Sequence, residues 1–130
     1  MRVNFLIVED DFIIKMFFER VIIKLNHNVV GETDNGKECI HLVEKLKPDV
    51  VLMDINIKGE INGVETALII QEKFGTRVVF ITGYARGILT DEMINKIRPI
   101  SIVKKPVNQN ILTREIEKIC KVLEQDNQVP

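Results

Sequence analysis

The stretch Asp49-Val50-Val51-Leu52-Met53-Asp54 contains four consecutive apolar residues and ends on an acid. A short, continuous apolar run of this kind is typical of a strand covered on both faces of a sheet. Runs of the same type alternate with stretches of helical length along the whole chain. Strands are predicted over residues 3–8, 29–33, 49–54, 77–82 and 99–104, and helices over residues 12–26, 36–46, 63–73, 88–97 and 108–124. This alternation predicts an α/β fold with right-handed crossovers and a parallel five-stranded sheet.

Length and composition indicate one ordinary domain. The chain has 130 residues, of which 45% are hydrophobic and 28% are charged, and its net charge is −1. We expect the domain to cover residues 1–124 and a flexible polar tail to cover residues 125–130. The charge balance gives no sign of direct contact with nucleic acid or membrane, and we find neither a membrane-spanning run nor a secretory signal. With Cys39 and Cys120 far apart and expected to be reduced thiols, a cytoplasmic protein is predicted.

Polar side chains stand where four of the five predicted strands end. Three acids follow the first strand, one acid ends the third, a threonine ends the fourth and a lysine follows the fifth: Glu9, Asp10, Asp11, Asp54, Thr82 and Lys105. The carboxyl ends of parallel strands lie at one edge of the sheet, where α/β proteins bind their ligands. Each residue alone has an ordinary structural explanation, such as helix capping by Asp11. Their joint placement favours a functional pocket.

The chemistry of such a pocket follows from its charges. Carboxylates packed together repel one another unless a cation neutralises them, and a compact set of oxygen ligands suits Mg²⁺. A metal-bound carboxylate of Asp54 is a nucleophile for in-line attack on a phosphoryl group. Lys105 and the Thr82 hydroxyl would neutralise charge on the transferred oxygens, and Gly83 leaves the approach open.

Five short motifs in this order resemble the receiver domain of response regulators in two-component signalling systems. They are Leu6-Ile7-Val8-Glu9-Asp10-Asp11, Val51-Leu52-Met53-Asp54-Ile55-Asn56, Asn62-Gly63-Val64-Glu65, Phe80-Ile81-Thr82-Gly83 and Lys104-Lys105-Pro106. Each motif is weak alone, but the ordered set at this spacing is specific. The resemblance covers essentially the whole chain.

The resemblance implies a site and a phosphodonor. Asp54 would be the phosphoacceptor, receiving its phosphoryl group from a histidine kinase or a histidine phosphotransfer protein. Asp10 and Asp54 would bind Mg²⁺, with Mn²⁺ as an alternative ion, together with the backbone carbonyl of Asn56. Either Glu9 or Asp11 would support the metal through water.

The resemblance also implies the architecture and the output. The fold would be flavodoxin-like, a doubly wound (βα)5 domain with strand order 2-1-3-4-5, and the Lys105-Pro106 bond would be cis. Thr82 would move to bond the phosphoryl group, and Lys105 would pair with it. We expect a stand-alone switch, monomeric or weakly dimeric, that changes its contacts with an unknown downstream protein and turns over no external substrate.

Two positions depart from the usual receiver pattern. Many receivers carry an aromatic residue three positions before the lysine of the Lys105-Pro106 motif, and this chain has Ile102 there. Lys104 stands where an apolar residue is more usual. These changes do not affect the expected phosphorylation at Asp54. They do leave undecided how phosphorylation is signalled through the surface around the fifth strand.

Three other functions compete with the switch. A magnesium-dependent phosphatase or phosphomutase with an aspartyl nucleophile usually has a second Asp two residues after the first, and Asn56 stands there. A flavin-binding electron carrier would have a loop rich in Ser, Thr and Gly after the first strand, where this chain has carboxylates. A degenerate receiver acting as an adaptor would have lost part of the set formed by Asp54, Thr82 and Lys105.

The first helix, two histidines and Tyr84 carry separate predictions. The first helix has more apolar residues than one core face needs, so we expect an exposed patch with Ile13 and Met16 or Phe17 that docks a kinase or phosphotransfer four-helix bundle. His27 and His41 are expected at the surface. Tyr84 either covers the phosphoryl pocket and slows hydrolysis or lies on the loop surface, and the sequence favours neither.

Overall fold

Five parallel strands form one sheet in the order β2-β1-β3-β4-β5 in the computed structural model, which describes residues 1–83 and 88–128. The strands are β1 (Asn4–Val8), β2 (Asn28–Thr33), β3 (Val50–Met53), β4 (Arg77–Thr82) and β5 (Ser101–Lys104). All four neighbouring pairs are parallel. The predicted fold class and strand order are confirmed.

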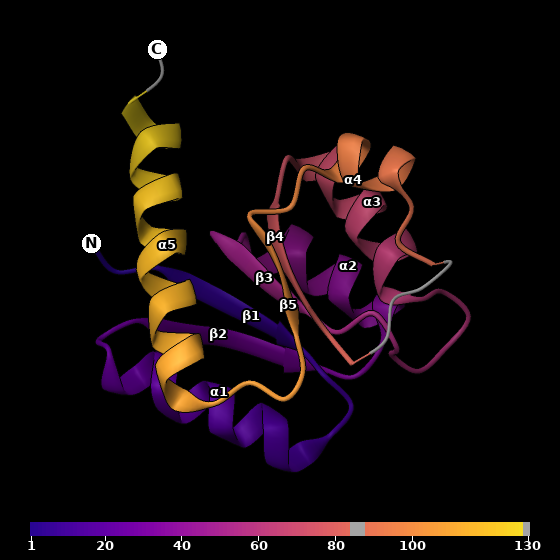
Figure 1. Ribbon diagram of the computed structural model, residues 1–130. Coiled ribbons are helices and arrows are strands. Elements are labelled where there is room, and N and C mark those ends of the chain that lie inside the picture. Colours follow the sequence, from indigo (N-terminus) through magenta and orange to yellow (C-terminus); the bar gives the residue numbers. More distant parts are fainter. Residues whose placement is uncertain (84–87, 129–130) are drawn as a thin grey trace.

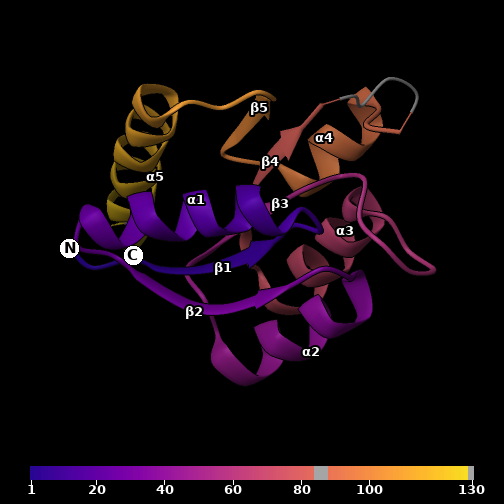
Figure 2. The same cartoon turned by 90° about the horizontal axis from the view of Figure 1, so that it is seen from below.

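Five helices cover the two faces of the sheet among the described residues. They are α1 (Phe12–Lys24), α2 (Gly36–Leu46), α3 (Gly63–Phe74), α4 (Asp91–Ile97) and α5 (Gln109–Gln128). Helices α1 and α5 lie on one face, and α2, α3 and α4 lie on the other (Figures 1 and 2). Each face has its own apolar cluster, and β3, which contributes to both, is buried along its whole length. This explains why its sequence is continuously apolar rather than alternating.

Side chains at the helix ends set where the helices begin. Asp11, Asn35 and Asn62 are the N-caps of α1, α2 and α3, and their side-chain oxygens accept backbone N–H groups of the first turn. Asn62 and Glu65 form a reciprocal capping box. Helix α3 ends at Phe74 and is capped by Gly75, whose φ of 66° lies in the left-handed region that glycine tolerates.

Two elements start two or more residues later than predicted. Helix α4 begins at Asp91 rather than at residue 88, because the Thr90 side chain caps it by accepting the Met93 N–H at 3.2 Å. Strand β5 begins at Ser101 rather than at residue 99. Proline has no N–H to donate to a neighbouring strand, which fits the position of Pro99 outside β5.

Helix α5 ends later than predicted. It continues to Gln128, four residues beyond the expected end at residue 124. Asp126 in this extra turn pairs with Arg77 at the start of β4, with 2.6 Å between Nη1 and Oδ2. This long-range contact ties the last turn to the sheet, and no local pattern in the sequence indicates it.

The end of α1 corrects the prediction for His27. The helix ends at Lys24, and Asn26 has a left-handed φ of 68°. His27 is half-buried rather than at the surface: its Nδ1 accepts the Val3 N–H at 3.0 Å, and its Nε2 lies 3.6 Å from Cys120 Sγ. The imidazole therefore satisfies a backbone group in the interior, a role that its polar sequence neighbours do not indicate.

Two further findings bear on the sequence predictions. Cys39 and Cys120 are both free thiols, as expected. None of the described helices has the length and apolar character needed to cross a membrane.

Candidate functional site

The candidate site lies at the carboxyl edge of the sheet, where backbone hydrogen bonds align the strand ends. The Asp54 N–H donates to the Val8 carbonyl at 2.9 Å, and this places Asp54 beside Glu9. The Lys105 N–H donates to the Thr82 carbonyl, also at 2.9 Å. Residues from four loops are thereby brought together by the parallel register, as the order of the strand ends predicts.

Three carboxylates gather at this edge. Glu9, Asp10 and Asp54 each offer one oxygen, and these oxygens lie within 4.8 Å of one another. Glu9 is 1% exposed and Asp54 is 5% exposed, whereas Asp10 faces solvent. Such a cluster supplies hard oxygen ligands for a divalent cation with one side open to an incoming group.

Lys105 bridges two of these acids. Its Nζ lies 2.7 Å from Glu9 Oε1 and 3.3 Å from Asp54 Oδ2. Burial alone would lower the pKa of Lys105, but its hydrogen bond to Glu9 and the Asp54 charge raise that pKa overall, so the ammonium stays charged. The Lys105–Pro106 peptide bond is cis, as the resemblance implies.

The Glu9 carboxyl is held in an unfavourable environment for a charge. Burial, and next the hydrogen bond with the Asp54 carboxyl, raise the pKa of Glu9 to about 7, although Lys105 opposes the shift. One half-buried ammonium therefore does not fully compensate these acids. A second cation would lower the electrostatic cost of having all of them ionised.

Asp11 has a different role from its two neighbours. Its Oδ1 accepts the N–H groups of Ile13 and Ile14 at 2.9 and 3.1 Å, so the side chain caps α1. It is not part of the three-acid cluster. Of the two alternatives that the sequence leaves open, Glu9 rather than Asp11 is the residue placed beside Asp54.

The loop between β3 and α3 holds Asn56 next to the phosphoacceptor candidate. The Asn56 N–H donates to Asp54 Oδ1 at 3.1 Å, and the Gly63 N–H closes the loop on the Ile55 carbonyl at 2.8 Å. A Cβ on Gly63 would lie 2.2 Å from the Asp54 carbonyl oxygen, so only glycine fits there. Sequence reasoning noted Asn62-Gly63 as a motif but did not foresee this close approach.

Among the described residues, nothing covers Gly83 at the Thr82 end of the site. Thr82 is buried at the end of β4, and a Cβ built on Gly83 meets no described atom within 4 Å. Tyr84, which the sequence leaves either over the pocket or on the loop surface, lies outside the described residues. Ile102 and Lys104 are both exposed on β5.

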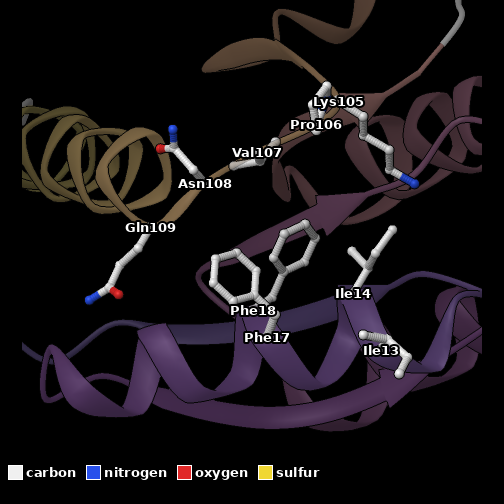
Figure 3. A pocket seen from close by; sticks show the side chains of 9 residues that line it. All are labelled: Ile13, Ile14, Phe17, Phe18, Lys105, Pro106, Val107, Asn108 and Gln109. Atoms are coloured by element: carbon white, nitrogen blue, oxygen red, sulfur yellow. The ribbon is translucent and has the colours of Figure 1, made fainter.

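An apolar groove lies beside this edge, between α1 and the loop that leads into α5. Its volume is about 760 Å³, and its lining residues are Ile13, Ile14, Phe17, Phe18, Lys105, Pro106, Val107, Asn108 and Gln109. Figure 3 shows the rings of Phe17 and Phe18 directed from α1 toward this loop. Ile13 is 70% exposed and Met16 is 42% exposed, which confirms the exposed apolar surface predicted on the first helix. The second wall, from Pro106 to Gln109, was not predicted, because it has no apolar periodicity.

Together, the fold and the site define a class: a phospho-accepting signalling switch built on a parallel α/β sheet. Residues 5–117 match the family described as the response regulator receiver domain. The chain belongs to this family. The proteins that this chain resembles give no support to the alternative function of a phosphatase or phosphomutase.

Individual relatives agree with this assignment. The chain is 27% identical over 117 residues to chemotaxis protein CheY of Thermotoga maritima, covering 89% of this chain and 96% of that protein. Among solved structures, the signal receiver domain of a modulated diguanylate cyclase from Desulfovibrio desulfuricans G20 has a TM-score of 0.81 at 28% identity, covering 97% of this chain and 99% of that one.

Other relatives are much longer than this chain. The chain is 30% identical over 107 residues to the phyllosphere-induced regulator PhyR of Methylorubrum extorquens, covering 82% of this chain but only 39% of PhyR. It likewise spans 38% of the transcriptional regulatory protein YdfI of Bacillus subtilis, at 31% identity over 83 residues. The similarity is therefore limited to the part of each of these proteins that aligns with this chain.

Proposed function

We propose that Asp54 accepts a phosphoryl group from a phosphohistidine donor and that the modified chain signals by changing its contacts with other proteins. The observation that carries the proposal is the position of the Asp54 carboxylate. It is buried at the centre of the carboxyl edge, beside Glu9 and Asp10, with Lys105 Nζ 3.3 Å away. A carboxylate in this setting is a shielded nucleophile next to fixed positive charge.

In the proposed reaction, an Asp54 carboxylate oxygen forms a bond to phosphorus while the bond from phosphorus to the donor imidazole nitrogen breaks. The imidazole leaves with the bonding electron pair and takes up a proton, and Asp54 becomes an acyl phosphate. Lys105 exchanges its bond to Glu9 for one to the phosphoryl group, and the Thr82 hydroxyl donates a second bond to that group. No external substrate is turned over in this scheme.

The acid cluster fits a hard divalent cation. Asp10, Asp54 and the backbone carbonyl of Asn56 would bind Mg²⁺ or Mn²⁺, with Glu9 acting through water. The cation would supply positive charge against the phosphoryl oxygens. The fit is supported by the raised pKa of Glu9, because three adjacent acids with one lysine leave negative charge to be neutralised.

The proposal is tested by incubating the protein with acetyl phosphate and measuring its intact mass. We expect the mass of one phosphoryl group to be added with Mg²⁺ and little to be added when EDTA replaces it. Hydroxylamine should remove the group, because acyl phosphates are cleaved by this nucleophile. No mass increase at any Mg²⁺ concentration, or a hydroxylamine-stable modification, would overturn the proposal.

Metal binding should depend on Asp10 far more than on Asp11. Asp10→Asn removes a proposed ligand and is expected to weaken Mg²⁺ binding by roughly tenfold to a hundredfold. Asp11→Asn keeps a capping side chain and should leave the Mg²⁺ affinity within about twofold of wild type. Titration of both variants with Mg²⁺ by calorimetry checks this, and equal losses of affinity would show that the two roles are wrongly assigned.

The groove beside Lys105 is the proposed docking site for the phosphodonor. A histidine kinase or phosphotransfer protein presents its histidine on a helix bundle, and apolar side chains of such a helix would fill the groove while the histidine faces Asp54. Such donors act in the cytoplasm, which is therefore the proposed location. The downstream protein would detect the phosphorylated state at the exposed surface around Ile102 and Lys104.

Ile13→Glu should slow transfer from a protein donor without slowing transfer from acetyl phosphate. Ile13 is exposed at the groove, so a charge there disrupts docking but leaves the acids intact, and we expect a loss of roughly tenfold or more. Ile23→Glu is the matched control, since Ile23 is 55% exposed on the same helix and does not line the groove. The measurement is the initial rate of transfer from a phosphorylated histidine phosphotransfer protein that reacts with the wild-type chain. Equal effects of the two variants would contradict docking in the groove.

A further inference from the structure

The turn between β2 and α2, together with the last residue of β2 and the first residue of α2 (residues 33–36), is bonded to both loops that carry the proposed metal ligands. The Thr33 carbonyl accepts the Glu9 N–H at 3.0 Å, at the start of the loop after β1. The Asp34 carbonyl accepts the Lys58 N–H at 3.2 Å, and Asn35 and Lys58 form an isolated parallel bridge. Lys58 lies only two residues after Asn56. A turn that supplies no ligand itself is therefore connected by backbone bonds to both sides of the site.

Close packing at Gly36 presses this turn against the far end of the loop between β3 and α3. A Cβ on Gly36 would lie 2.2 Å from Thr66 Oγ1 and 2.7 Å from Ile61 Cγ1, which is far inside van der Waals contact. Thr66 is fully buried and cannot turn away freely, because its hydroxyl donates to the Asn62 carbonyl at 2.8 Å. An added methyl group at position 36 must therefore displace the turn, the loop or both.

Ion pairs between the same two segments constrain the loop less than the backbone bonds and the packing at Gly36 do. Lys37 Nζ lies 3.0 Å from Glu60 Oε2, and Lys58 Nζ lies 3.9 Å from Asp34 Oδ2. Three of these side chains are largely exposed and that of Asp34 is about half exposed, and ion pairs at the surface are screened by solvent and contribute little to stability. The backbone bridge and the packing at Gly36 are therefore the main constraints on the loop.

We propose that the turn formed by residues 33–36 is a positioning element of the metal site. By packing on Ile61 and Thr66 and by bonding to Lys58, it sets where the loop between β3 and α3 runs, and with it the backbone of Asn56. This inference rests on the proposed function, since it concerns the same metal site. None of the turn residues contacts the cation in this proposal, so Gly36 is a positioning residue and not a catalytic one.

The test compares Mg²⁺ binding by the wild-type protein and by Gly36→Ala, using calorimetry with Mg²⁺ alone. We expect Gly36→Ala to weaken Mg²⁺ binding by roughly tenfold, because a ligand displaced by even a fraction of an ångström loses much of its contribution. Phosphorylation by acetyl phosphate should slow at low Mg²⁺ and recover to near the wild-type rate at saturating Mg²⁺. A merely structural role for Gly36 would not produce this dependence on Mg²⁺ concentration.

Gly75→Ala is the matched control. Gly75 also favours glycine, because its φ is 66°, but it caps the far end of α3, and a Cβ built on it meets no atom of the other described residues within 4 Å. This substitution should lower the melting temperature and leave Mg²⁺ affinity unchanged. If Gly36→Ala does not give a cooperative melting transition, Ile61→Ala tests the same contact from the loop side, with an expected severalfold loss of Mg²⁺ affinity.

The outcomes separate this inference from the proposed function. Wild-type Mg²⁺ affinity in a folded Gly36→Ala protein, or in Ile61→Ala where that variant replaces it, would overturn the positioning role while leaving the metal site in place. An equal loss of affinity in Gly75→Ala would also overturn it, because the effect would then follow stability alone. Failure of the wild-type protein itself to bind Mg²⁺ would refute the proposed metal site, and the positioning role with it.

Discussion

Replacing Asp54 by Asn is expected to abolish phosphorylation by acetyl phosphate, with a loss in rate on the order of a thousandfold or more. An amide oxygen is a much weaker nucleophile than a carboxylate oxygen, and the substitution also removes one proposed metal ligand. Asn has nearly the same shape as Asp, so Lys105 and the surrounding strands keep their packing. Intact mass after incubation with Mg²⁺ and acetyl phosphate gives the result directly.

Two controls separate the loss of the nucleophile from other effects. Asp10→Asn weakens the proposed metal site but keeps Asp54, so raising the Mg²⁺ concentration should restore its phosphorylation and should not rescue Asp54→Asn. A melting curve checks that Asp54→Asn is folded. Retention of the added phosphoryl group in that variant would show that another acid accepts it.

Mg²⁺ affinity is expected to rise severalfold between pH 6 and pH 8. The pKa of Glu9 is raised from 4.5 to about 7 by burial and by the neighbouring Asp54 carboxyl, so below pH 7 much of the protein carries a proton on Glu9. A protonated Glu9 adds less negative charge to the site, and proton and metal therefore compete. Mg²⁺ titrations at several pH values, at constant ionic strength, measure the effect.

The same shift predicts how the stability of the metal-free protein changes with pH. Because Glu9 binds its proton more tightly in the folded than in the unfolded chain, its favourable contribution is fully present below pH 4.5 and is lost as pH rises through about 7. The difference is roughly 3 kcal/mol for a shift of this size. Addition of Mg²⁺ should therefore raise the melting temperature more at pH 8 than at pH 6.

Glu9→Gln isolates this contribution from other titrating groups. The pKa of His27 is lowered chiefly by burial, so its contribution has the opposite sign: it is present above pH 6.5 and is lost as pH falls through the lowered folded-state pKa. In Glu9→Gln, metal-free stability should fall less between pH 5 and pH 8 than in the wild-type protein, with the remainder due to Glu32, whose pKa is also raised by burial. Equal Mg²⁺ affinity in the wild-type protein at pH 6 and pH 8 would contradict the role given to Glu9.

The fold and the members of the site were predictable because they follow from local patterns and one topological rule. Apolar runs such as Val50–Met53 alternate with helical stretches, which leaves a parallel sheet as the natural arrangement. Parallel strands end at the same edge, so residues that follow different strands, such as Glu9, Asp54 and Lys105, had to meet. Ordered motifs then indicated the family.

Tertiary contacts decided what local patterns leave open. Either Glu9 or Asp11 was compatible with the sequence, and the choice depends on Asp11 bonding the first turn of α1 while Glu9 reaches Lys105. The apolar groove beside Lys105 has one wall from α1 and another from residues 106–109, which are distant in sequence and share no pattern. The requirement for glycine at Gly36 likewise arises only because Thr66 and Ile61 pack against it. Periodicity encodes which face of an element is buried, whereas the partner on that face exists only once the chain has folded.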